Sequence, residues 1–131
     1  MEILIILTKV KLNEELKVVL DKQNIVYEGL DENYLRIFKS PNHSIRLEIY
    51  DNKYQDIEDE WLNHKHKEKG FNFYTLNYYD IEFVKTILSL LDYDETWINN
   101  DFENINYTLK EFNSKIHKYP KWDWRIDENS E

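Results

Sequence analysis

The sequence predicts an α+β domain with a mainly antiparallel sheet of about five strands and three to four helices packed on it. Several short segments are apolar or alternate with period two, as strands do, and several longer ones repeat apolar residues at helical spacing. The 131 residues suit one domain, and two Gly and two Pro leave no visible linker. We expect residues 1–125 to form the domain and the polar residues 126–131 to be a disordered tail.

The first half of the chain begins with a strand and a helix. Residues 1–8 are apolar on both faces, which is typical of a central strand. Apolar residues then recur at helical spacing over residues 11–24, with charged residues on the opposite face. Turn residues next separate three short strands at 25–30, 34–39 and 44–51, and the last of these alternates between apolar and polar positions.

The middle of the chain alternates between helix and strand signals. Acidic residues after Asp56 and basic residues before Gly70 are typical of the first and last turns of one helix. Residues 71–79 predict a strand with aromatic side chains on both faces, so it is either central or turns one face to a partner. Asp80 is placed to cap a helix over residues 81–91.

The last third combines an irregular stretch with one well-marked helix. Residues 92–106 predict irregular structure, apart from a short strand at 96–99. Thr108 and Glu111 have the spacing of a capping box, which opens a helix that ends before Pro120.

Three tryptophans can lie either in the core or in an interface: Trp97, Trp122 and Trp124. Large aromatic side chains are mostly buried, which favours the core for the last two. The sequence leaves the choice open.

Composition excludes several classes of function. The chain has no Cys, hence no disulfide, thiolate nucleophile or Cys-type zinc site, and we expect a cytoplasmic protein. Its N-terminal apolar run is shorter than a signal peptide or a transmembrane helix requires, so no membrane partner is expected. A net charge of −9 argues against nucleic acid and favours a basic partner. The lack of Ala and the 14 Asn and 14 Ile residues fit A/T-rich codons, indicating a bacterium or its phage.

A divalent-metal-dependent hydrolase is one alternative function. On a helix, Asp56, Glu60 and His64 would line one face at a spacing that can chelate an ion. His64 and His66 diverge by about 200° on a helix, however, which does not suit a zinc site. An exposed helix with dipole-matched charges explains the same residues. We therefore expect no metal site, no cofactor and no catalytic residue.

An acidic, aromatic stretch near the C-terminus is the strongest candidate for a binding surface. No Lys or Arg lies between Lys85 and Lys110, and the acidic excess is greater after Gly70 than before it. Carboxylates beside aromatic rings can steer and anchor a basic protein patch. The alternative is that the aromatic residues belong to the core and the acids to a solvated loop. The candidate binding residues are Asp92, Tyr93, Asp94, Glu95, Trp97, Asp101 and Glu103.

A resemblance points the same way. Three segments, Trp97-Ile98-Asn99-Asn100-Asp101-Phe102, Leu109-x-x-Phe112 and Pro120-Lys121-Trp122-Asp123-Trp124-Arg125, resemble the C-terminal part of small acidic bacterial proteins encoded beside polymorphic toxins as immunity proteins. The resemblance implies a cytoplasmic inhibitor that binds a cognate toxin and has no catalytic residues.

These observations favour an acidic, non-enzymatic inhibitor that neutralises a toxin or defence effector by occluding a basic site. It would be an immunity protein or a phage-encoded inhibitor. The alternatives are the hydrolase at Asp56, Glu60 and His64 and a subunit of a homo-oligomer. The oligomer would leave residues 71–79 as an exposed sheet face.

Overall fold

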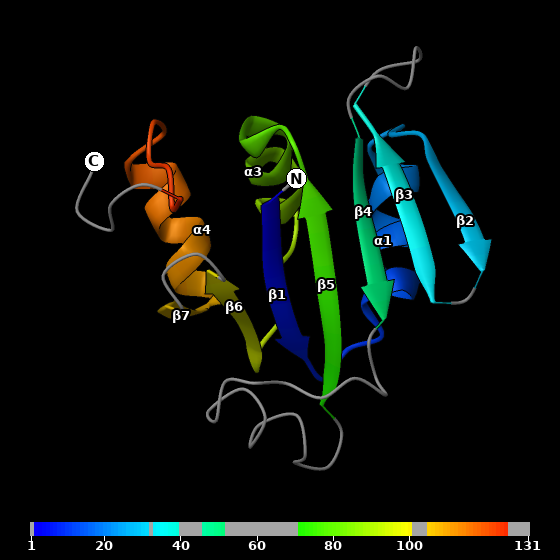
Figure 1. The fold of residues 1–131 in the computed structure, drawn as a ribbon, viewed down its shortest axis with the longest axis horizontal. Coiled ribbons are helices and arrows are strands. Elements are labelled where there is room, and N and C mark those ends of the chain that lie inside the picture. The colour runs from blue at the N-terminus through cyan, green and yellow to red at the C-terminus, as the bar shows by residue number, and fades with distance from the viewer. Residues whose placement is uncertain (1, 32, 40–45, 52–70, 101–104, 126–131) are drawn as a thin grey trace.

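The protein is an α+β structure with one antiparallel sheet, shown by the computed structural model in Figure 1. The structure describes residues 2–31, 33–39, 46–51, 71–100 and 105–125. Its elements, in chain order, are β1 (Glu2–Thr8), α1 (Leu12–Lys22), β2 (Tyr27–Asp31), β3 (Tyr34–Phe38), β4 (Arg46–Asp51), β5 (Asn72–Tyr78), α3 (Ile81–Leu88), β6 (Thr96–Asn100), β7 (Ile105–Thr108) and α4 (Leu109–Lys118).

The sheet has seven strands in the order β2-β3-β4-β5-β1-β6-β7. The prediction that β1 is internal is confirmed, because β1 pairs with β5 on one side and with β6 on the other. β5 is also internal and has aromatic residues on both faces, as the sequence indicates. Within the 71–79 segment, Phe73 is 5% exposed, whereas Tyr79, which directly follows β5, is 64% exposed.

The helices α1, α3 and α4 pack on the same face of the sheet. Their apolar residues form one buried cluster with alternate residues of the strands, such as Ile6, Tyr74 and Ile98. Those three residues lie directly opposite one another on β1, β5 and β6, so they form a row across the sheet. On the other face, the next row, Phe73, Leu7 and Trp97, forms a smaller apolar cluster.

The strand count differs from the prediction because of the β6–β7 hairpin. The sequence predicts about five strands with a short strand at 96–99, and the structure confirms that strand as β6. The sequence predicts irregular structure up to residue 106, yet Ile105–Thr108 form β7, which pairs with β6 from Trp97 opposite Thr108 to Asn100 opposite Ile105. The sequence pattern does not reveal β7, because a strand of four residues at a sheet edge buries few side chains and therefore has little apolar alternation.

Two helices, α3 and α4, start at their predicted capping residues, although α3 ends at Leu88 and not at residue 91. Asp80 accepts hydrogen bonds from the backbone N–H groups of Glu82 and Phe83 at the start of α3. At the start of α4, Thr108 and Glu111 form the reciprocal capping box. The start of α1 has no side-chain cap, and there the backbone N–H of Leu12 donates instead to the Tyr74 hydroxyl at 3.0 Å.

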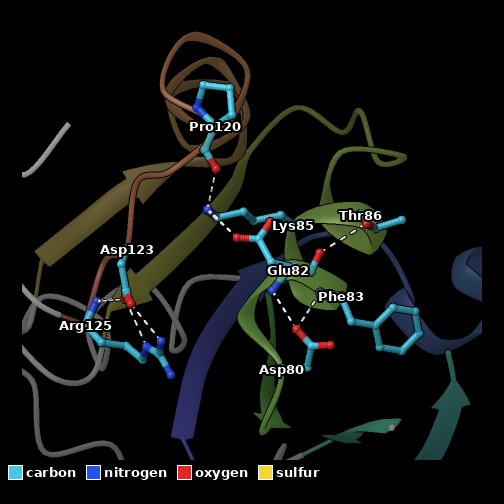
Figure 2. A network of polar contacts seen from close by, with 8 residues as sticks. All are labelled: Asp80, Glu82, Phe83, Lys85, Thr86, Pro120, Asp123 and Arg125. Carbon is cyan, nitrogen blue, oxygen red and sulfur yellow. Dashed lines mark hydrogen bonds and ion pairs between the residues drawn. The ribbon is translucent and has the colours of Figure 1, made fainter.

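The C-terminal segment belongs to the core. Trp122 and Trp124 are 0% and 1% exposed, and both rings pack against Phe112 of α4. The Lys85 ammonium anchors the segment by donating to the backbone carbonyl of Pro120 at 2.8 Å (Figure 2). These contacts resolve the choice for two of the three tryptophans.

Three sequence expectations lie outside the described residues: the helix between Asp56 and Gly70, the beginning of the 44–51 strand, and the disordered tail at 126–131. Within the described part of the chain, no helix combines the length and the hydrophobicity that crossing a membrane requires.

Candidate functional site

The candidate site lies at the end of the sheet where β1 finishes. Thr8, the last residue of β1, is opposite Asn72 of β5 and Thr96 of β6. The hydroxyls of Thr8 and Thr96 are 2.7 Å apart and both side chains are buried. This contact fixes the start of β6, and with it the segment 92–95 that precedes the strand.

Four of the predicted binding residues line one pocket at this end of the sheet. The pocket has a volume of about 380 Å³. Its walls come from the 92–95 segment and β6, from Phe71 before β5, and from the junction of β7 with α4. The lining residues are Phe71, Tyr93, Asp94, Glu95, Thr96, Trp97, Thr108, Leu109 and Lys110.

The two predicted aromatic residues have different environments. Tyr93 is partly buried against the main core, and burial, followed by the negative charge of Glu15, raises the pKa of its hydroxyl. Trp97 is partly buried on the opposite face of the sheet, where it packs against the Leu7 and Phe73 cluster. Neither ring is wholly core or wholly free, so each can support a ligand in the pocket while helping to hold the sheet.

The carboxylate of Glu95 is held by a lysine. Lys9 lies 3.2 Å from Glu95 and its ammonium is 5.1 Å from the centre of the Phe71 ring. Glu95 also has a φ of 51°, a left-handed conformation that is uncommon for a residue with a side chain. The backbone turn and the lysine therefore fix the position of Glu95 and offset its charge.

Asp92 and Asp94 are the free acids of the segment. Both are exposed, and no described residue forms a hydrogen bond or an ion pair with either carboxylate. Asp94 lines the pocket, and Asp92 lines a neighbouring hollow of about 580 Å³ that runs along α4. The other two predicted acids, Asp101 and Glu103, lie outside the described residues.

Sequence reasoning missed the side of the pocket that α4 supplies. Thr108 and Lys110 reach the pocket because β7 pairs with β6 and places the start of α4 beside Trp97. The sequence marks Thr108 only as a helix cap, and nothing in it links Lys110 to the acidic stretch. Lys110 places a cation in the pocket wall, so the surface is mixed in charge rather than uniformly acidic.

A second, smaller pocket lies on the other side of Thr8, at the start of α1. Its volume is about 210 Å³. Polar side chains dominate its lining, which consists of Lys11, Asn13, Glu14, Asn33, Asp51, Asn72 and Tyr74. Sequence analysis did not identify this pocket, because its residues come from four separate elements or turns.

A polar network covers the helix-free face of β3 and β4. Glu48 accepts hydrogen bonds from Arg46 at 3.1 Å and from Tyr50 at 2.8 Å, and Arg36 donates to Tyr34 at 3.0 Å. Burial alone would raise the pKa of Glu48, but hydrogen bonds from Tyr34, Tyr50 and Arg46 lower it. Because these groups bind one another, the network stabilises the sheet surface.

The described residues contain no cluster of three or more His, Cys, Asp or Glu side chains that could hold a metal ion. The residues of the hydrolase alternative, Asp56, Glu60 and His64, lie outside the described part of the chain. The 380 Å³ pocket offers carboxylates, aromatic rings and one ammonium group, which suit the binding of a mixed polar and apolar surface.

Comparisons with known proteins identify no family for this chain. No protein-family model matches the chain, and neither a curated protein nor a solved structure gives a significant match.

Proposed function

We propose that this protein is a non-enzymatic inhibitor that neutralises a basic toxin or defence effector by covering its basic site. It would act as an immunity protein or a phage-encoded inhibitor. The observation that carries the proposal is the pair of exposed carboxylates, Asp92 and Asp94, beside a pocket walled by Tyr93 and Trp97.

The mechanism combines long-range steering with a short-range anchor. A net charge of −9 draws a cationic surface toward the protein, and steering of this kind raises association rates by about 10- to 1,000-fold. Asp92 and Asp94 direct the approach because Lys9 already offsets the charge of Glu95. Once the partner is in place, partly buried aromatic rings such as Trp97 supply contact area at low entropic cost.

The first test is a binding experiment with the products of the reading frames adjacent to this gene. Calorimetry and stopped-flow measurements would give the affinity and the association rate constant at several salt concentrations. Replacement of Asp92 and Asp94 by Lys should lower the association rate constant by about tenfold or more at low salt, and the difference should shrink as salt screens the charges.

A charge reversal at the far end of β1 serves as a matched control for the reversals at Asp92 and Asp94. Glu2→Lys also reverses an exposed charge, but Glu2 starts β1 and lies about 20 Å from Thr8 at its other end. It should change association much less than Asp94→Lys. Binding that is insensitive to salt and to both reversals at Asp92 and Asp94 would overturn the proposal.

A further inference from the structure

We propose that the outer side of α4 is a second docking surface, which binds an acidic segment of the protein's partner through Lys110 and Lys118. This surface adjoins the 380 Å³ pocket, because Lys110 lines both. That the segment belongs to the same partner rests on the proposed function; the preference of the surface for protein carboxylates does not.

The helix α4 is basic in an acidic protein. It has three Lys and one Glu, whereas the whole chain has a net charge of −9. Glu111 serves the capping box, where its carboxylate accepts a hydrogen bond from the N-cap backbone N–H at 3.0 Å. Lys115 is partly buried, and its ammonium lies 5.0 Å from the centre of the Trp122 ring. The exposed charges of the outer side are therefore mainly those of Lys110 and Lys118.

These two ammonium groups are not neutralised within the part of the chain that the structure describes. Lys110 and Lys118 are exposed, and neither forms an ion pair with a described residue. The Lys118 ammonium lies 5.2 Å from the centre of the Tyr119 ring, a contact that positions the charge without cancelling it. Both charges therefore remain available to carboxylates from outside the molecule.

Helix stability explains one of the two lysines and not the other. Lys118 is in the last turn of α4, where a cation interacts favourably with the helix dipole. Lys110 is the second residue of the helix, where the same dipole opposes a positive charge. The position of Lys110 thus costs the helix a little stability, which favours a role in binding.

Hollows flank α4 on both sides. One of about 580 Å³ extends toward the end of α3, and another of about 540 Å³ extends toward β7. Lys110, Ser114 and Lys118 line both hollows, and because they recur every four residues they form one ridge. The helix lies at the side of the molecule where β7 forms the edge of the sheet (Figure 1). A partner can therefore reach the ridge from either flank.

The wall of the larger hollow is held in place before a partner arrives. The Asn113 side chain on α4 donates hydrogen bonds to the backbone carbonyl groups of Leu88 at 2.9 Å and Leu91 at 3.2 Å. These bonds fix α4 against the end of α3. A surface that is already ordered loses less entropy on binding.

The pattern of charge favours a protein segment over a nucleic acid. Asp92 lines the 580 Å³ hollow together with Lys110 and Lys118, so one acid stands beside the two cations. A nucleic-acid strand carries a charge at every phosphate and would place one against Asp92. A protein segment can space its carboxylates to match the two lysines, which are about 12 Å apart along the helix, and can set a neutral or basic residue opposite Asp92.

The test is an NMR titration of the ¹⁵N-labelled protein with the peptide N-acetyl-(Glu-Gly)3-amide. Its first and third glutamates are about 13 Å apart when the peptide is extended, which matches the two lysines. The (Gln-Gly)3 peptide is the uncharged control, and single-stranded hexathymidylate forms a third arm. At low salt the glutamate peptide should shift the backbone amides of Lys110, Ser114 and Lys118, with a dissociation constant on the order of 1 mM. The other two ligands should not shift them.

Two double variants with the same change in net charge separate the ridge from general electrostatics. Lys110→Gln with Lys118→Gln should weaken binding of the glutamate peptide about three- to tenfold. Lys11→Gln with Lys22→Gln removes two exposed charges from the ends of α1 and should weaken binding by less than about twofold. Lys110→Gln alone should not lower the melting temperature, because the helix dipole opposes the charge that it removes.

The inference is overturned by equal shifts with the glutamine peptide or hexathymidylate, by no shift with the glutamate peptide, or by equal losses from the two double variants. A lower melting temperature for Lys110→Gln would also overturn it, because the lysine would then support the helix.

A partner, once identified, separates this inference from the proposed function. Lys110→Gln with Lys118→Gln should lower the partner's affinity about three- to tenfold. A partner that depends on Asp92 and Asp94 but not on the two lysines would overturn the inference and leave the proposed function intact. If the glutamate peptide binds α4 but no partner depends on Asp92 and Asp94, the proposed function fails and the preference of α4 for carboxylates stands.

Discussion

Asp80 holds α3 with one carboxylate that serves two purposes. Its Oδ1 accepts hydrogen bonds from the backbone N–H groups of Glu82 at 3.0 Å and Phe83 at 3.4 Å (Figure 2). Its Oδ2 accepts a hydrogen bond from the Lys39 ammonium at 2.9 Å, which ties the start of α3 to the end of β3. Two substitutions separate these contributions, because Asn can cap a helix and Ala cannot.

The expected magnitudes follow from the two contacts. Asp80→Ala removes the cap, worth about 1 kcal/mol, and an ion pair worth about 0.5 kcal/mol because Lys39 is well exposed. Asp80→Asn keeps the cap and loses the ion pair alone. In thermal unfolding at pH 7, Asp80→Ala should therefore lower the melting temperature by roughly 5 °C, and Asp80→Asn should lower it by roughly 2 °C.

The difference between the native protein and Asp80→Asn should also depend on pH. The hydrogen bond from Lys39 is the largest cause that lowers the pKa of Asp80, with the backbone donors adding to it and burial opposing it. A carboxyl with a depressed pKa in the folded state contributes stability above its unfolded pKa, near 4, and loses it as the pH falls through the folded value. The stability advantage should be complete at pH 7 and should be lost as the pH falls from the unfolded pKa through the lower, folded one.

Chemical denaturation of both proteins from pH 7 to pH 2 measures that difference directly. An advantage that persists unchanged at pH 2 would refute the role of charge at Asp80. A loss for Asp80→Asn at pH 7 as large as the loss for Asp80→Ala would refute the assignment of the cap.

Three further predictions concern the candidate site and the C-terminal core. Thr108→Ala should destabilise the protein by about 1 kcal/mol in denaturant unfolding, because it removes the capping box that starts α4. Glu95→Asn should keep the left-handed turn, which Asn tolerates, while releasing Lys9; NMR should show a changed Lys9 environment and an intact fold. Trp122→Ala should cost about 3–5 kcal/mol, far more than Trp97→Ala, and similar losses would contradict their different burial.

Helices and internal strands could be predicted because their signals are local. The apolar period of α1 and the caps at Asp80 and Thr108 lie within a few residues of the elements that they define. β1 could be placed inside the sheet because both of its faces are apolar. β7 could not be found this way, since its place depends on pairing with β6 rather than on its own sequence.

The candidate site was only partly predictable for a related reason. Tyr93, Asp94, Glu95 and Trp97 are close in sequence, so one local acidic and aromatic pattern identifies them, and the structure places them in one pocket. The α1 pocket has no such pattern, because β1, β4 and β5 must pair before Asn13, Asp51 and Tyr74 can share one wall.

Lys9, which pairs with Glu95 beside the 380 Å³ pocket, bears on selectivity. Net charge alone would steer a cationic partner toward any acidic part of the protein. At the pocket, however, the Lys9 ammonium lies 3.2 Å from Glu95, so a partner that places a cation opposite Glu95 meets a like charge. Like-charge contacts disfavour wrong registers, while Asp92 and Asp94 remain open to the correct one. Lys9→Met should thus broaden the range of basic proteins bound, and an unchanged range would show that the lysine serves stability alone.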